Sequence, residues 1–247
     1  MLDAVLARFV EACPVAVLAQ LALRRALQPE WVDALFAAHA EQQDTRELLF
    51  STVVDLMALV AVGLRPSLHA AAREALAQGA LGVSVPALYA KVNHSEPAVL
   101  RALVRESAAR LAPVVPHLRP GGGPWPAGYR VRVLDGNHLP ASEKRVGPLR
   151  GQRAAALPGQ ALVLYDPVHD LVVDLVAGED AHAGETTYVP PLVATAGPGE
   201  LWIAARHFAT RAPRALHAAG ARTRRAPGPH AGRRARVRGP LRDGLGI

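Results

Sequence analysis

The chain has 247 residues, and its 28 Lys and Arg against 21 Asp and Glu give a formal net charge of +7. Its single cysteine, Cys13, excludes an intramolecular disulfide and any site with several cysteine ligands, which favours a reducing cytoplasm. The N-terminus is too charged for a signal peptide, and the most apolar run, 48–64, is short for a bilayer and contains Asp55. We therefore expect a cytoplasmic protein without a membrane partner.

The positive charge is concentrated at one end of the chain. Residues 209–247 contain 10 Arg and one acidic residue, Asp243, whereas the remainder has slightly more acidic than basic residues. The segment is rich in Ala, Gly and Pro and shows neither helical nor strand periodicity. A segment with so little apolar surface cannot offset the entropy of ordering its backbone, so we expect a disordered basic tail. Its composition is also what GC-rich DNA encodes out of frame, which suggests a frameshift shortly after Phe208.

Residues 1–115 are predicted to be helical. Apolar residues recur at helical spacing from the first residues onward, beginning with Leu2, Val5, Leu6 and Phe9 and continuing beyond Pro14 with Val15, Leu18 and Leu21. Proline and serine signals then predict helices over 30–40, 47–63, 68–77, 84–93 and 98–111. Successive helices of this kind are typical of a helical bundle.

The segment 82–93 is the best candidate for reading DNA. Ser84 is placed to cap a short helix whose Leu88 packs inward, while Tyr89 and Lys91 would face outward. A short helix after a glycine turn and another helix resembles a helix-turn-helix, whose second helix enters the major groove. Any capped helix of a bundle shows the same pattern, so both interpretations stay open.

The helix expected over 98–111 carries three arginines on one face, Arg101, Arg105 and Arg110. A basic helix face is most often simply solvated. Contact with DNA phosphates is the alternative, and it makes Arg101 and Arg105 candidate binding residues.

A Pro- and Gly-rich stretch, 116–128, predicts a linker between the helical region and a region with β-strands. After it, 129–134 alternates and is rich in β-branched residues, which predicts a strand that ends at Asp135. The runs 161–166 and 171–176 flank a short turn and predict a hairpin.

A helix over 185–196 and a short apolar strand over 201–203 complete the predicted elements. Because little apolar sequence follows, we expect that last strand to form an uncovered sheet edge, which would favour association. Asp166, Asp170 and Asp174 lie on or beside the hairpin, where turn residues and solvated strand edges explain them best.

Two strand ends carry a resemblance to a known family. The sequences Asp135-Gly136-Asn137-His138-Leu139 and Trp202-Ile203-Ala204-Ala205-Arg206-His207-Phe208 resemble motifs of insertion-sequence transposases of the DDE class, which have an RNase H-like catalytic domain. The resemblance covers most of residues 1–208. It implies an α+β chain in which a helical, DNA-binding region (1–115) precedes a partial RNase H-like domain (129–208).

The resemblance also implies the chemistry that this chain has lost. In the family, three carboxylates hold two Mg²⁺ ions for DNA strand transfer; Asp135 matches the first carboxylate, and Ala205 stands at the position of the second. The helix that bears the third has no counterpart here. We therefore expect a catalytically defective transposase fragment that does not bind Mg²⁺ tightly.

The expected partner is DNA, both transposon ends and target, and a second copy of the chain is a further candidate. Lys144 and Arg145 match a polar stretch of the family that could touch phosphate, although a solvated loop explains them equally well. DNA binding would place the protein at the nucleoid. An alternative is a DNA-binding or dimerising fragment that regulates a full-length relative, and a weaker one is nonspecific nucleic-acid binding through the tail.

Overall fold

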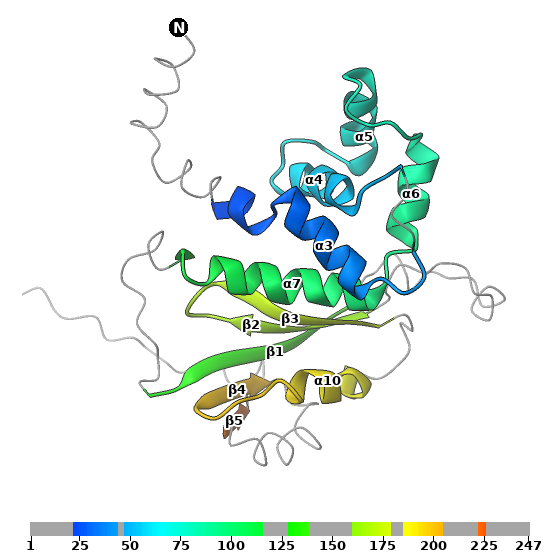
Figure 1. Cartoon of the computed structure of the whole chain (residues 1–247). Helices are drawn as coiled ribbons and strands as arrows, with labels where there is room; N and C mark the ends of the chain where they lie inside the picture. Colours follow the sequence, from blue (N-terminus) through cyan, green and yellow to red (C-terminus); the bar gives the residue numbers. More distant parts are fainter. Residues whose placement is uncertain are drawn as a thin grey trace, which may run out of the picture.

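The computed structural model describes residues 22–43, 47–115, 128–138, 160–178, 185–204 and 222–225, which form an α+β protein with a layer of helices and a mixed sheet (Figure 1). Predictions that concern Lys144, Arg145 or Ala205, most of the linker, and most of the tail lie outside these residues. No helix in the described ranges is both long enough and apolar enough to cross a membrane.

The helices expected from residue 30 onward are present in the expected order, whereas the helical spacing predicted over residues 1–21 lies outside the described residues. They are α3 (Pro29–His39), α4 (Phe50–Ala61), α5 (Leu68–Ala77), α6 (Val85–Asn93) and α7 (Pro97–Leu111). A proline occupies the first turn of α3, α6 and α7, where its missing N–H costs nothing. The hydroxyl of Ser67 caps α5 by accepting a hydrogen bond of 3.2 Å from the backbone N–H of Ala70. These local signals explain why the bounds agree with the sequence to within a few residues.

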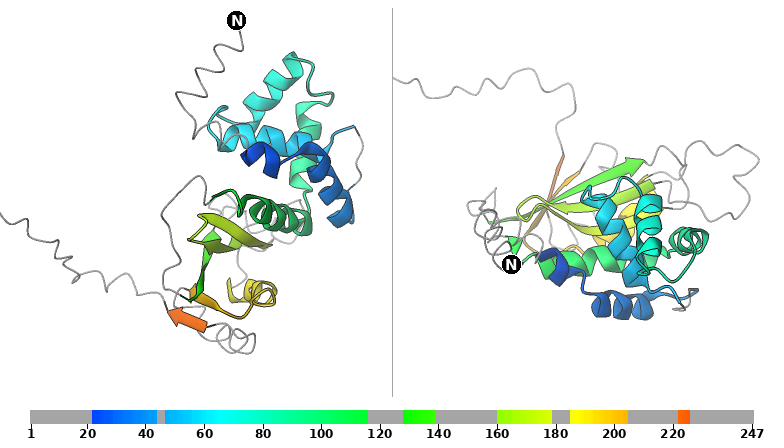
Figure 2. Two further views of the ribbon diagram at one scale, coloured as in Figure 1. Left: turned by 60° about the vertical axis from the view of Figure 1, so that its left-hand side comes forward. Right: turned by 90° about the horizontal axis from the view of Figure 1, so that it is seen from above.

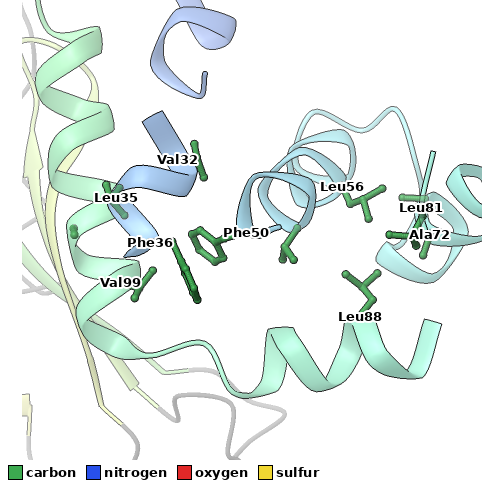
Figure 3. Packing of buried hydrophobic residues seen from close by; sticks show 12 residues of the cluster. Val32, Leu35, Phe36, Phe50, Leu56, Ala72, Leu81, Leu88 and Val99 are labelled. Atoms are coloured by element: carbon green, nitrogen blue, oxygen red, sulfur yellow. The ribbon is translucent and has the colours of Figure 1, made fainter. Parts of the chain in front are cut away.

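One apolar core joins these helices (Figure 3). At its centre the rings of Phe36 and Phe50 stack with centroids 5.0 Å apart. Leu88 of α6 and Val99 of α7 are fully buried in the same cluster. The inward position predicted for Leu88 is thereby confirmed.

The sheet has the strand order β3-β2-β1-β4-β5. Its strands are β1 (Arg130–His138), β2 (Gln160–Asp166), β3 (Leu171–Gly178), β4 (Glu200–Ala204) and β5 (Arg222–Arg225). Strand β2 runs antiparallel to both β1 and β3, while β4 is parallel to β1 and β5 is parallel to β4. The predicted hairpin and the predicted strand at 201–203 are both confirmed.

One face of the sheet is covered by a short helical segment, consisting of the 3-10 turn η2 (Glu185–Tyr188) and α10 (Val189–Val193). Leu192 of α10 is buried with Leu134, Leu162 and Trp202 of the sheet. Along β2, buried and half-buried positions alternate, because successive side chains point to opposite faces. The α-helix is shorter than expected over 185–196, because residues 185–188 form the 3-10 turn η2 and α10 ends at Val193.

Two expectations are wrong, one about the end of β1 and one about the tail. Strand β1 does not end at Asp135 but continues to His138, because its antiparallel pairing with β2 extends that far. The region 209–247 is not without regular structure, since Arg222–Arg225 form β5 and cover the edge of β4. Backbone N–H and C=O groups at an open strand edge can pair with any extended segment, whatever its side-chain pattern. Apolar periodicity therefore could not reveal this strand.

Helix α7 connects the two parts of the fold. Its Val99 and Ala102 belong to the helical core, and the same helix lies alongside β3 (Figures 1 and 2). The predicted boundary therefore follows the last helix in sequence, but that helix packs in space against both the other helices and the sheet.

Candidate functional site

Asp135 lies where the parallel and antiparallel ladders of β1 separate. Its antiparallel partner is Val163, whereas the last described pair between β1 and β4 is Leu134 with Ala204. The side chain of Asp135 is exposed, and its Oδ1 accepts a hydrogen bond of 3.0 Å from the backbone N–H of Gly136. The carboxylate is thus held on a paired strand and is open to solvent.

The described residues do not provide a magnesium site around Asp135. No three His, Cys, Asp or Glu side chains in the described ranges come together in a group that could hold a metal ion. Mg²⁺ requires several hard oxygen ligands in near-octahedral geometry, and one carboxylate leaves most of its charge uncompensated.

The acids of the hairpin do not replace the missing ligands. Asp174 is buried and belongs to the sheet face opposite to Asp135, as its pairing with Leu164 shows. Arg101 of α7 donates to both of its carboxylate oxygens at 2.8 Å, and the Nε of Arg105 lies 3.9 Å from it. The view of Asp174 as a solvated edge residue is therefore wrong, because a long-range ion pair neutralises it in the interior.

Asp166 belongs to a second buried group of charges. It pairs with Arg132 of β1, whose Nε also lies 3.3 Å from Glu200 of β4. The ring Nδ1 of His169 lies 2.9 Å from Asp166, and the indole N–H of Trp202 donates to Glu200 at 2.9 Å. The turn role predicted for Asp166 is confirmed, since its Oδ1 also accepts the backbone N–H of His169 at 3.2 Å. The same carboxylate serves the turn and a buried ion network.

The sequence contains one signal of this network, the arginine at position 132. Arg132 alternates with Val131 and Val133 and therefore shares the α10 face with Leu134, where an apolar residue would be expected. A charge on the core-facing side of a strand indicates a buried partner. Nothing in the local pattern, however, identified Asp166 and Glu200 as those partners.

The network predicts a loss of stability in acid. Burial alone would raise the pKa of Asp166, but hydrogen bonds from His169 and Arg132 and the charge of Arg132 outweigh it and hold that pKa below its usual value. A lowered pKa in the folded state adds stability above the unfolded value of about 4, and this stability disappears as the pH falls through the folded pKa. Urea midpoints at pH 6 and pH 3 should therefore differ less for Asp166→Asn than for the native chain.

The matched control for this acid effect is Glu30→Gln, which changes an exposed carboxylate on α3. It should leave the pH dependence of the urea midpoint unchanged. An equal change in both variants would show that Asp166 is not responsible for the acid effect.

The candidate DNA-contacting residues differ widely in their surroundings. Ser84 caps α6, and its hydroxyl accepts from the backbone N–H of Ala87 at 3.4 Å. Tyr89 is exposed, as predicted, at 38%. Lys91 instead places its ammonium 4.2 Å from the centroid of the Phe36 ring, so the prediction that it faces outward is wrong. The half-buried lysine gains a cation–π contact in this position.

The arginines of α7 also have intramolecular partners. Arg101 and Arg105 face Asp174, as described above. Arg110 lies over the ring of Trp31 at 4.6 Å and donates to the backbone carbonyl of Arg25 at 2.8 Å. The basic face of α7 therefore holds the helix against its neighbours, which neither sequence interpretation foresaw.

Comparisons with known proteins supply no relative: no protein-family model, no curated protein and no solved structure matches this chain.

Proposed function

We propose that this chain is a transposase-related protein with a partial RNase H-like domain that has lost catalytic strand transfer. The observation that supports it is the strand arrangement: the order β3-β2-β1-β4-β5, in which β2 alone is antiparallel to the others. The resemblance to the family implies the first part of this arrangement, three antiparallel strands followed by a parallel strand at 201–203. A fold by itself does not define a function, so the two motifs must carry the rest of the proposal.

The described pairing of β1 with β4 reaches the residues that immediately precede the two motif positions. Leu134 pairs with Ala204, so the residues that follow them in the chain are Asp135 and Ala205. In the proposed ancestor, two carboxylates would have met at this end of β1 and β4. Substitution by alanine removes one of them, and no third acid is present among the described residues near Asp135. Two-metal chemistry needs these ligands to compensate the charge of both ions.

DNA remains the proposed partner, and α6 is the part of the surface that supports it best. Its exposed side includes Tyr89 and Asn93, which are able to donate hydrogen bonds or stack. The case for Lys91 and Arg101 as DNA contacts is weaker in the structure than in the sequence, because both side chains have intramolecular contacts.

The test compares the native chain with Ala205→Asp, and with Asp135→Ala as the control that removes the remaining ligand. We expect weak Mg²⁺ or Mn²⁺ binding by the native chain, tighter binding by Ala205→Asp, and no DNA nicking by any of them, because in-line transfer still lacks its third carboxylate. Isothermal titration and relaxation of supercoiled plasmid provide the two measurements. Nicking by the native chain that needs a divalent ion and is lost in Asp135→Ala would overturn the proposal.

A dimerising fragment that regulates a full-length relative is the second candidate. It is favoured by large apolar side chains exposed on α4 and on the turn that follows it: Met57 is 46% exposed, Val62 54% and Leu64 61%. Exposed apolar residues that cluster on one surface often mark an interaction site.

A further inference from the structure

An apolar groove runs between α4 and α7 in the helical part of the protein. Its volume is about 520 Å³, and its walls include Val54, Met57 and Ala61 of α4 and Leu100, Leu103 and Val104 of α7. Leu103 and Val104 are only half-buried, and Met57 is exposed. We call this feature the α4–α7 groove. An apolar channel between two helices is a suitable seat for a third helix with one apolar face.

One end of the α4–α7 groove is formed by the first described residues of the chain. Residues 22–26 are helical, and Leu23 and Leu27 line the groove. The 21 residues that precede them lie outside the described residues and are directly attached to this end. An attached segment has an effective concentration in the millimolar range, which gives it a large advantage over any partner in solution.

The sequence of that segment has the pattern that such a groove requires. Leu2, Leu6, Phe9 and Cys13 follow one another at intervals of four or three residues, so they would share one face of a helix, while Asp3 would lie elsewhere. Pro14 ends this pattern and marks a place where the chain can change direction. Residues 14–21 link this segment to the first described residue, Ala22.

We propose that residues 1–13 form an amphipathic helix that binds in the α4–α7 groove of the same chain. Burying the apolar face of this helix against Met57, Leu103 and Val104 removes apolar area from water on both sides. The groove walls carry few polar groups, which are Asn93, Ser95 and Ser107. The contact is thus nearly all apolar and suits this occupant better than a polar ligand.

The first experiment uses the native cysteine, because Cys13 lies at the end of the proposed apolar face. A photoreactive maleimide on Cys13 of the full chain is activated, and the cross-linked peptides are identified by mass spectrometry in a mixture of ¹⁵N-labelled and unlabelled chains. We expect cross-links to peptides of α4 or α7 within one isotopic species. Cross-links between isotopic species would show that a second copy fills the groove, and cross-links elsewhere would also overturn the proposal.

The second experiment compares Phe9→Glu with Arg8→Glu, two neighbouring substitutions of which only the first alters the apolar face. We expect Phe9→Glu to raise the fluorescence of an apolar dye such as ANS severalfold, because the groove becomes accessible, and Arg8→Glu to leave it at the native level. Circular dichroism at 222 nm should stay native for Arg8→Glu and should fall for Phe9→Glu by no more than the contribution of the released segment, which separates release from unfolding. Equal dye binding by the two variants would refute the proposal without bearing on the transposase relationship.

Discussion

Replacing Arg132 with methionine should destabilise the folded protein by about 3–5 kcal/mol, the cost of leaving buried charges without their partner. Arg132 is 9% exposed, and the two acids that it contacts, Asp166 and Glu200, are 2% and 8% exposed. Methionine fills a similar volume, so the effect reports the lost charge and hydrogen bonds rather than a cavity. Equilibrium unfolding in urea, followed by far-UV circular dichroism, measures the change.

Arg130 provides the matched control for this prediction. It lies on the same strand two residues earlier and is exposed, and its backbone N–H donates to the carbonyl of Gly199, a hydrogen bond that a side-chain substitution retains. Arg130→Met should therefore change stability by no more than about 0.5 kcal/mol. If Arg132→Met changed the free energy of unfolding as little as Arg130→Met, Asp166 and Glu200 would have to be neutral or solvated in the folded protein.

Local signals in the sequence predicted a large part of the fold. The capping serine and the early proline of α6 fixed its bounds because both act within one helical turn. The turn opened by Asp166 similarly determined the hairpin of β2 and β3, because its carboxylate binds the N–H groups of the next residues. Elements whose determinants lie within a few residues could be found from the sequence.

The remainder depends on contacts between distant residues. Strand β5 forms because β4 offers an open edge, and its own sequence, Arg222–Arg225, has no apolar pattern to announce it. The continuation of β1 past Asp135 depends on pairing with β2. At the candidate site, the exposed position of Asp135 agrees with its proposed ancestry, but the lysine of α6 and the arginines of α7 have partners that only the folded chain brings close.

Replacing Arg101 with methionine should cost about 3 kcal/mol, toward the lower end of the range for breaking a buried pair, because the Arg101 side chain is 25% exposed while that of Asp174 is 3% exposed. Arg101 also donates to the backbone carbonyl of Pro191 in the segment before β4, so its loss loosens two contacts between α7 and the sheet region. Hydrogen exchange should accelerate in α7 and in β3 together. Urea unfolding gives the stability change.

Arg105→Met is the matched control, one turn further along α7. Its guanidinium lies 3.9 Å from the same carboxylate and its side chain is 50% exposed, so the loss should be within about 0.5 kcal/mol. The pair also separates a structural role from DNA contact. If both arginines contacted phosphate, replacing either one would lower the DNA affinity and the salt dependence of binding. The two variants would then have similar free energies of unfolding. A stability loss confined to Arg101→Met, with exchange rising on both sides of the α7–β3 contact, would establish that this arginine holds the helical layer on the sheet.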